Sequence, residues 1–303
     1  MYRIYIVAEA SAEVFEQLGT KRKFWFWDDQ NQKMLFKEGR PGTGENWAEK
    51  IACELCTTLS IPHAEYELAR WKNFDGVVSQ TFVPDGWRLV LGNEIISHLI
   101  EGYKKEVKYK QKQYTLRRAL ILLKSGIINL PNGFHGSDDI RTALDVFIGY
   151  LMFDAWIANQ DRHHENWGVV VSTDKKIYLA PTFDHASGFG RNETDQNRID
   201  RLTTKDKRRN MDSYAAKALT PFYSSTTSSK PLSTLDAFLE AARLNPNAAR
   251  YWLNKLDNIS SNDTLRFFRK IPSTHITQPA IDFAQKILSI NKERLLSSSG
   301  ELL

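Results

Sequence analysis

Short runs of aromatic and β-branched residues, separated by polar turns, fill the first part of the chain. The runs VFEQLG, KFWFWD and KMLFK are separated by GTKR and DQNQ. Apolar runs with turn compositions between them predict three short strands in a meander. A further strand is predicted from about Gly76 to Phe82, after which Pro84, Asp85 and Gly86 interrupt the apolar pattern.

A four-residue apolar repeat lies between the third and fourth predicted strands. Trp47, Ile51, Leu55 and Leu59 recur at this spacing and form one apolar stripe. We expect a helix from about Trp47 to Leu59, with Asn46 as its N-cap. The N-terminal part of the chain is therefore predicted to be a small sheet with one helix.

Beyond residue 84 the pattern becomes helical. Ser137 precedes DDIRTALDVFIGYLMFDAWIANQ, whose apolar residues are too dense for a surface helix, so we expect a central helix here. From about Ser233 the runs LDAFLEAARL, NAARYWLNKL and PAIDFAQKILSINKERLL predict further helices, and the polar residues 224–234 predict a surface loop. The pattern favours an α+β fold of two lobes, with a sheet and helix in residues 1–84 and a larger, mainly α-helical lobe in residues 85–303.

Composition limits the possible classes of protein. The 303 residues are 42% hydrophobic and 25% charged, which is typical of a globular chain. The only cysteines, Cys53 and Cys56, exclude a disulfide framework and favour a reducing compartment. Neither a secretion signal nor an apolar run of bilayer length is present. We therefore expect a cytoplasmic protein that does not bind a membrane, while secretion as an effector stays open. The net charge of +5 does not by itself indicate nucleic-acid binding.

The most informative segment is IANQDRHHENWGVVVSTDKKIYLAPTFDHASGFG. Asp161 and Asn166 have a D-x-x-x-x-N spacing directly after the central helix, and Asp184 follows two apolar runs. If Trp167–Val171 and Ile177–Phe183 form a hairpin, Asn166 returns opposite Asp184. Mg²⁺ prefers such hard oxygen ligands together with phosphates and water, so the arrangement favours a metal-nucleotide site.

Other interpretations of these residues remain. A capping aspartate and a loop asparagine would produce the same D-x-x-x-x-N spacing. His163, His164 and His185 suggest zinc, although adjacent histidines rarely bind one metal and no cysteine is near. Cys53 and Cys56 form a C-x-x-C without a second pair, which favours small-residue packing on a helix.

The chain resembles the HipA-like serine/threonine kinases in the motifs LFKEG, GTGENWAEKIACEL, VVSQTF, NQDRHHENWGVV and FDHASGFG. The resemblance covers about residues 15–290 and implies a two-lobed kinase fold related to phosphatidylinositol kinases. It implies that Asp161 is the catalytic aspartate and that Asn166 and Asp184 bind magnesium. Asp184, His185 and Ala186 replace the DFG tripeptide of ordinary protein kinases.

The same resemblance assigns a nucleotide site. Lys37 takes the place of the lysine that holds the α- and β-phosphates, and Glu49 would pair with it, with Glu45 as a rival. The loop Gly19, Thr20 and Lys21 would cover the phosphates. The segment Ser79–Val83 would be the hinge between the lobes and would read adenine through its backbone. The remaining residues assigned to the nucleotide are Ser79, Gln80, Thr81, Phe82, Val83 and His163.

The function implied is an ATP- and Mg²⁺-dependent kinase that phosphorylates serine or threonine in a protein, as a toxin or effector, with a separate small antitoxin or regulatory subunit as a possible partner. A kinase of a lipid or small molecule is an alternative. A second is a catalytically silent module that binds nucleic acid or protein through the basic run at residues 104–118, which otherwise predicts a solvated face. Residues 185–210 are polar, and we expect them to be mobile until a substrate binds.

Overall fold

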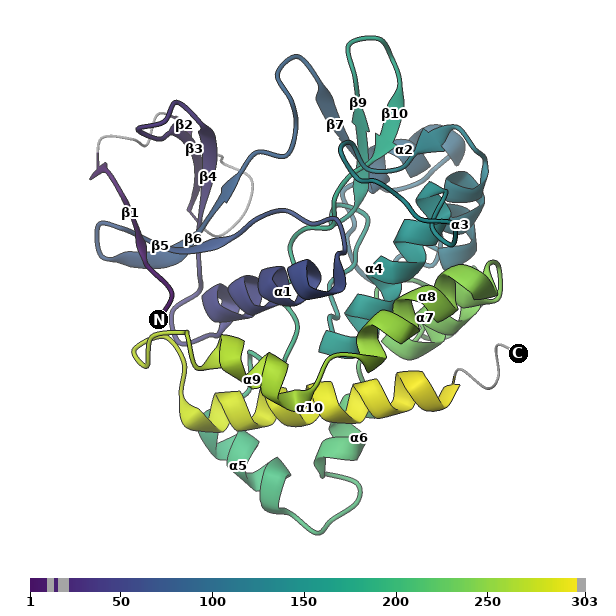
Figure 1. Ribbon diagram of the computed structural model, residues 1–303. Helices are drawn as coiled ribbons and strands as arrows, with labels where there is room; N and C mark the ends of the chain where they lie inside the picture. The colour runs from purple at the N-terminus through teal and green to yellow at the C-terminus, as the bar shows by residue number, and fades with distance from the viewer. Residues whose placement is uncertain (10–13, 16–21, 299–303) are drawn as a thin grey trace.

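The computed structural model describes residues 1–9, 14–15 and 22–298, and it shows two lobes (Figure 1). A six-stranded sheet in the order β1-β5-β6-β4-β3-β2 forms most of the N-terminal lobe. The predicted meander is confirmed, since neighbours in the series β2, β3 and β4 pair antiparallel. The sequence pattern missed β1 and β5, which pair in parallel. The strands are β1 (Tyr5–Val7), β2 (Val14–Phe15), β3 (Lys23–Trp27), β4 (Lys33–Glu38), β5 (Glu67–Trp71) and β6 (Phe74–Gln80).

The two faces of this sheet have different roles. Phe24, Phe36 and Trp71 pack together on one face, with ring centroids 5.0–6.3 Å apart. Lys37 follows Phe36 in the same strand and is paired with Val77 of β6, so its side chain lies on the opposite face. That face looks toward α1 (Glu45–Leu59), which packs on β5 and β6.

Helix α1 is buried along almost its whole length. The predicted stripe from Trp47 to Leu59 lies in the core, and Cys56 on another face is also fully buried, because the sheet covers one side of α1 and α8 and α9 cover another. The predicted N-cap is wrong: the helix begins at Glu45, and Gly44 is the N-cap. The Glu45 carboxylate accepts a hydrogen bond from the backbone N–H of Arg40. This hydrogen bond fixes the turn before the helix, so the helix begins two residues before the predicted start at Trp47.

The central helix of the C-terminal lobe is α4 (Ala143–Ile157), in which every residue is buried. It begins five residues later than predicted, because Thr142 in an extended conformation forms a capping box with Asp145. Figure 1 shows α10 running beneath α4, and α3, α7 and α8 pack on the same helix. The other helices are α2 (Gly92–Leu99), α3 (Leu116–Lys124), α5 (Asp195–Thr203), α6 (Met211–Ala216), α7 (Thr234–Ala242), α8 (Pro246–Asp257), α9 (Ser261–Phe268) and α10 (Gln278–Ser297).

Among the described residues, no helix combines the length and the apolar character that crossing a bilayer requires. The helices predicted in the tail are confirmed as α7, α8 and α10, and α9 lies between the last two.

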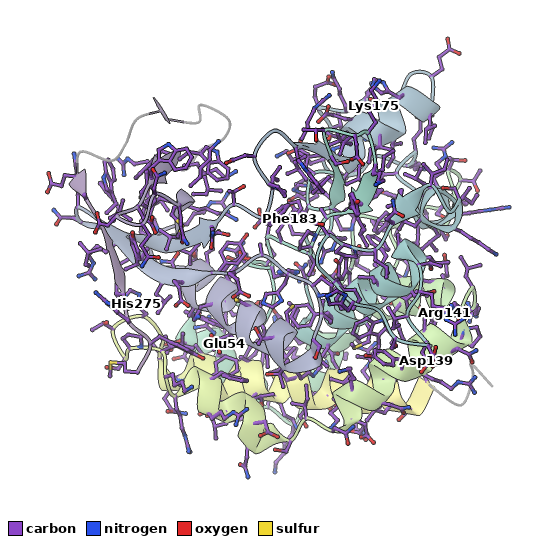
Figure 2. All side chains as sticks on the ribbon, turned by 45° about the horizontal axis from the view of Figure 1, so that its top comes forward. Glu54, Asp139, Arg141, Lys175, Phe183 and His275 are labelled. Atoms are coloured by element: carbon purple, nitrogen blue, oxygen red, sulfur yellow. The ribbon has the colours of Figure 1, made fainter. Side chains whose placement is uncertain are left out.

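A second sheet, in the order β7-β9-β10-β8, supports the region after α4. The predicted hairpin is confirmed as β9 (Gly168–Val171) and β10 (Ile177–Leu179), which pair antiparallel. Lys175 lies in its turn, as Figure 2 shows. The pairing ends where the N–H of Ala180 donates to the carbonyl of Gly168. The segment before β9 and the segment after β10 therefore leave the hairpin at the same end. The outer strands are β7 (Arg88–Leu91) and β8 (Ile128–Asn129).

The segment after Asp184 is folded, so the prediction of a mobile stretch from residue 185 to residue 210 is wrong for most of it. Phe189 is fully buried, Arg191 is 7% exposed, and α5 packs against α10. An apolar ring within a polar run is enough to anchor the segment. Residues 185–194 form turns before α5, and residues 204–210 between α5 and α6 also lack a helix; the basic residues of this second stretch are exposed.

Candidate active site

A cavity of about 460 Å³ lies between the sheet of the N-terminal lobe and the loops around the β9–β10 hairpin. Figure 2 labels Phe183, which lies between the two lobes and stacks on Phe82 with ring centroids 5.6 Å apart. The cavity brings together most of the residues assigned to the nucleotide. Those residues are Lys37, Ser79, Gln80, Thr81, Phe82, Val83, His163, Asn166 and Asp184.

The other predicted residues lie elsewhere. Asp161 does not line this cavity, but its Oδ1 is 3.8 Å from Nε2 of His163, which does. Glu49 lies behind Lys37 in α1. The predicted phosphate loop, Gly19, Thr20 and Lys21, is outside the described residues.

An ion pair joins the two lobes inside the cavity. Nζ of Lys37 lies 2.5 Å from Oδ1 of Asp184 and 3.9 Å from Oε2 of Glu49. Burial lowers the pKa of Lys37, but the charges of Asp184 and Glu49 outweigh it and raise this pKa. Burial likewise raises the pKa of Asp184, and Lys37 reverses the effect and lowers it. Both groups are therefore charged at neutral pH.

Glu49, and not its rival Glu45, is the carboxylate beside Lys37. Glu49 is 1% exposed, and its Oε1 accepts the backbone N–H of His185 at 2.8 Å. Its Oε2 has no hydrogen-bond partner among the described residues. Burial raises the pKa of Glu49, which Lys37 partly offsets. Glu45 instead accepts hydrogen bonds from Arg40 and Arg191.

A buried ion pair that the sequence interpretation missed fixes the loop between α4 and β9. The guanidinium of Arg162 donates from Nε and Nη2 to the two carboxylate oxygens of Asp154, both at 2.7 Å. Nη1 donates to the carbonyl of Asn166 at 2.7 Å, and the carbonyl of Arg162 accepts from Tyr114 at 2.9 Å. Asp154 lies near the end of the dense apolar run of α4, away from the capping Asp145, and a buried carboxylate requires a partner, which was the available signal.

The donor set fits magnesium. The side-chain Nδ2 of Asn166 donates to the carbonyl of Asp161 at 2.7 Å, which leaves Oδ1 of Asn166 as the atom available to a cation. Asp184 offers carboxylate oxygens and has a φ of 58°, a left-handed conformation that aspartate tolerates better than most residues. Hard oxygen ligands from one carboxylate and one amide, in a cavity open to phosphates, are what Mg²⁺ prefers.

Asp161 has hydroxyl partners on both carboxylate oxygens. Tyr109 donates to Oδ1, and Ser187 donates to Oδ2 at 3.4 Å. Tyr109 belongs to the basic run for which the sequence predicts a solvated face, and Nζ of Lys108 in the same run lies 2.5 Å from the Glu165 carboxylate. Part of the run therefore lies over the loop that carries Asp161.

The three histidines proposed as zinc ligands do not converge. His163 faces Asp161, while Nδ1 of His164 shares a 2.6 Å hydrogen bond with Tyr103. His185 shares one with Thr182 at 2.8 Å. Burial lowers the pKa of His164 to about 4, so this ring is neutral at pH 7.

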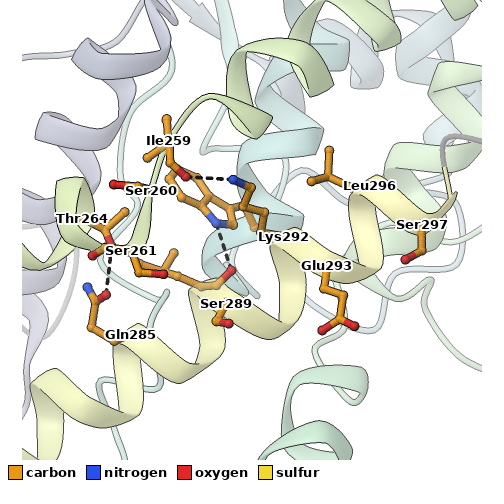
Figure 3. Close-up of a pocket in the computed structure, with 12 residues that line it drawn as sticks. Ile259, Ser260, Ser261, Thr264, Gln285, Ser289, Lys292, Glu293, Leu296 and Ser297 are labelled. Atoms are coloured by element: carbon orange, nitrogen blue, oxygen red, sulfur yellow. Dashed lines mark hydrogen bonds between the residues drawn. The ribbon is translucent and has the colours of Figure 1, made fainter.

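A separate cavity of about 460 Å³ lies between α9 and α10 (Figure 3). Its lining mixes hydroxyl and amide side chains with apolar and charged ones, and Thr264 donates to Oε1 of Gln285 at 2.9 Å. Nζ of Lys292 is held by the carbonyls of Asp257 and Ile259 at 2.7 and 2.8 Å. This cavity contains none of the residues that the sequence assigns to a nucleotide, so the lobe-joining cavity with Lys37 is the candidate active site.

Comparison with solved structures supports the two-lobed α+β fold. No protein-family model matches the sequence, and no curated protein matches it. The structure is similar to the proinflammatory kinase CtkA of Helicobacter pylori, with a TM-score of 0.73 and 18% identity over 96% of this chain and 94% of that one. It is also similar to HipA of Shewanella oneidensis, solved with HipB and operator DNA, with a TM-score of 0.60 and 13% identity over 96% of this chain and 67% of that one. The chain therefore has the two-lobed α+β fold of the HipA-like kinases.

Proposed function

We propose that this protein is an ATP- and Mg²⁺-dependent kinase that transfers the γ-phosphoryl group to a serine or threonine hydroxyl of a protein. The observation that carries the proposal is the ion pair of Lys37 with Asp184, backed by buried Glu49, in a cavity between two lobes of a kinase-like fold. A cation from the sheet, a carboxylate from the other lobe and a glutamate from the helix are the parts that hold a nucleotide in kinases.

The cavity offers different surfaces to the two ends of a nucleotide. Apolar side chains of Leu35, Phe82 and Leu91 line it near the hinge, where a flat base would be buried. We propose that the backbone of residues 79–83 contacts the base there without any particular side chain. Lys37 lies toward the other lobe, where it would align the phosphates.

Transfer would use the residues at the ends of the hairpin. Oδ1 of Asn166 and the carboxylate of Asp184 would hold Mg²⁺, which when bound neutralises charge on the transferred phosphoryl group. Asp161 would orient the acceptor hydroxyl and take its proton, since its carboxylate already accepts hydroxyl hydrogen bonds. Arg162 would keep this loop in place through Asp154 and the Asn166 carbonyl.

The acceptor and the partner follow from the comparisons only as proposals. CtkA is named as a kinase without its acceptor, so a protein acceptor rests on the resemblance to the HipA-like serine/threonine kinases, and a lipid or small-molecule acceptor is the alternative. HipA is solved with HipB and DNA, and we propose that this chain also has a separate regulatory partner, which affinity purification from the native cell would capture.

The test is a transfer assay with matched aspartate variants. Purified protein is incubated with γ-labelled ATP, Mg²⁺ and, separately, a protein lysate or a lipid extract. Label should pass to protein with the wild type and with Asp139→Asn, which alters an exposed carboxylate far from the cavity. It should be lost with Asp161→Asn and with Asp184→Asn. Transfer to lipid alone would identify the alternative, and no transfer by the wild type would refute a kinase.

A further inference from the structure

A tyrosine hydroxyl occupies the position that the proposed function assigns to the acceptor. The hydroxyl of Tyr109 donates to Oδ1 of Asp161, and its ring meets the His163 ring edge-on, with centroids 5.5 Å apart. Tyr109 is 51% exposed, so the ring is at the surface while its hydroxyl reaches the catalytic aspartate. The contact joins residues 52 positions apart in the chain.

The segment carrying Tyr109 is held at the mouth of the nucleotide cavity. Residues 104–112 contain no helix or strand, but Nζ of Lys108 lies 2.5 Å from the Glu165 carboxylate. The side chain of Gln111 donates to the carbonyls of Lys104 and Val107, both at 3.0 Å. Because Lys108 itself lines the cavity, the neighbouring Tyr109 lies beside the space where a terminal phosphate would be placed.

On the basis of the proposed function, we propose that Tyr109 is an intramolecular phosphate acceptor of this kinase. The phenolic oxygen attacks the γ-phosphorus of bound ATP, and Asp161 takes the phenolic proton. The bond between the γ-phosphorus and the oxygen that bridges it to the β-phosphate breaks, and ADP leaves. The products are phosphotyrosine at position 109 and ADP, so atoms and charge balance without any further reactant.

The second hydroxyl at Asp161 is less suited to this role. Ser187 donates to Oδ2 at a long distance of 3.4 Å, and its oxygen is also engaged by Nη2 of Arg191 at 3.2 Å. Ser187 lies in the segment that buried Phe189 and Arg191 anchor, whereas Tyr109 lies on a surface segment without helix or strand. Burial and the hydrogen bond to Asp161 raise the pKa of the Tyr109 hydroxyl, so a base is required to remove its proton.

The decisive measurement is site mapping on the full chain. Protein treated with phosphatase is incubated with ATP and Mg²⁺, then analysed by intact mass and by peptide sequencing. We expect one phosphoryl group, located on Tyr109. Tyr109→Phe should remove it, and Tyr251→Phe, which alters a partly exposed tyrosine on α8, should retain it. Since wild-type mapping needs no variant, a folding defect in Tyr109→Phe would not affect the conclusion.

Kinetics distinguish transfer within one chain from transfer between chains. The rate constant for Tyr109 phosphorylation should not change over a tenfold range of protein concentration, and wild-type protein should leave Tyr109 of an added Asp161→Asn chain unmodified. Phosphate on Ser187 or elsewhere, or labelling of that added chain, would overturn the proposal. If a lysate protein is labelled while Tyr109 is not, this proposal fails and the kinase function stands; if neither is labelled, the kinase function itself fails.

Discussion

Replacing Asp154 by asparagine tests how much the loop around Asp161 depends on the buried ion pair between Asp154 and Arg162. Arg162 is fully buried, Asp154 is 2% exposed, and two hydrogen bonds of 2.7 Å join them. Asp154→Asn keeps the shape of the side chain but removes the negative charge, so the guanidinium is left buried without a counter-charge. The change therefore tests charge rather than volume.

The expected cost follows from that geometry. Two charges about 4 Å apart attract by about 4 kcal/mol at an effective dielectric constant of about 20. Breaking a buried pair by removing one partner typically costs about 3–5 kcal/mol, a large share of the roughly 5–15 kcal/mol that stabilises a domain. Urea unfolding with an unchanged m-value would measure the loss. The control is Asp138→Asn, which breaks the exposed pair with Arg141 and should cost under about 1 kcal/mol.

A paired replacement separates stability from catalysis. Asp154→Leu combined with Arg162→Met fills the same space with apolar atoms and should recover most of the lost stability. Turnover of this double variant should be roughly 100-fold below that of the wild type, because the Asn166 carbonyl no longer receives the 2.7 Å hydrogen bond that positions the loop. A loss below about 1 kcal/mol for Asp154→Asn, or full turnover in the double variant, would refute this account.

Three further variants test the site and its surroundings. Asp184→Asn should abolish transfer, because it removes a metal ligand, and should lower the melting temperature without unfolding the protein, because Lys37 loses its 2.5 Å ion pair but keeps Glu49 at 3.9 Å; a labelling assay and a thermal scan check this. Asp161→Asn should leave ATP affinity within a few fold in calorimetry while turnover falls by about 10²–10⁴, the range for a lost general base. Because burial lowers the pKa of His164 to about 4, the unfolded chain binds a proton that the folded chain does not between about pH 6.5 and pH 4. Stability is then complete above pH 6.5 and falls on acidification by on the order of 3 kcal/mol, and His164→Asn, which keeps a polar group beside Tyr103, should lessen this fall in urea titrations at pH 7 and pH 4.5.

The elements that sequence patterns predicted best are those whose burial is periodic. The apolar stripe from Trp47 to Leu59 and the dense apolar run of α4 predict directly which helix faces are buried. Their starts were predicted poorly, because an N-cap depends on local hydrogen bonds. Ser137 resembles a cap, but its backbone forms a bridge with Ile140, and Thr142 caps α4.

Some residues of the candidate site could be predicted from local spacing, and others could not. Asn166 and Asp184 lie on either side of a hairpin, so local spacing was enough to predict that they line one cavity. The contact between Tyr109 and Asp161 has no such signature, since nothing in a solvated basic run specifies which loop it covers. Contacts between distant segments depend on how whole elements pack, and a single sequence contains no pattern that records them.

Helix α1 connects the proposed nucleotide and acceptor sides of the site. Its carboxylates Glu45 and Glu49 are one turn apart and therefore lie on one face. Glu49 accepts the N–H of His185, next to Asp184, while Glu45 accepts a hydrogen bond from Arg191 farther along the same segment. The segment is thus held by one rigid helix at two points, on either side of the residues that approach Asp161. Any movement of α1 that displaces Glu49 from Lys37 must also displace the Arg191 contact, so binding at Asp184 and the geometry around Asp161 change together.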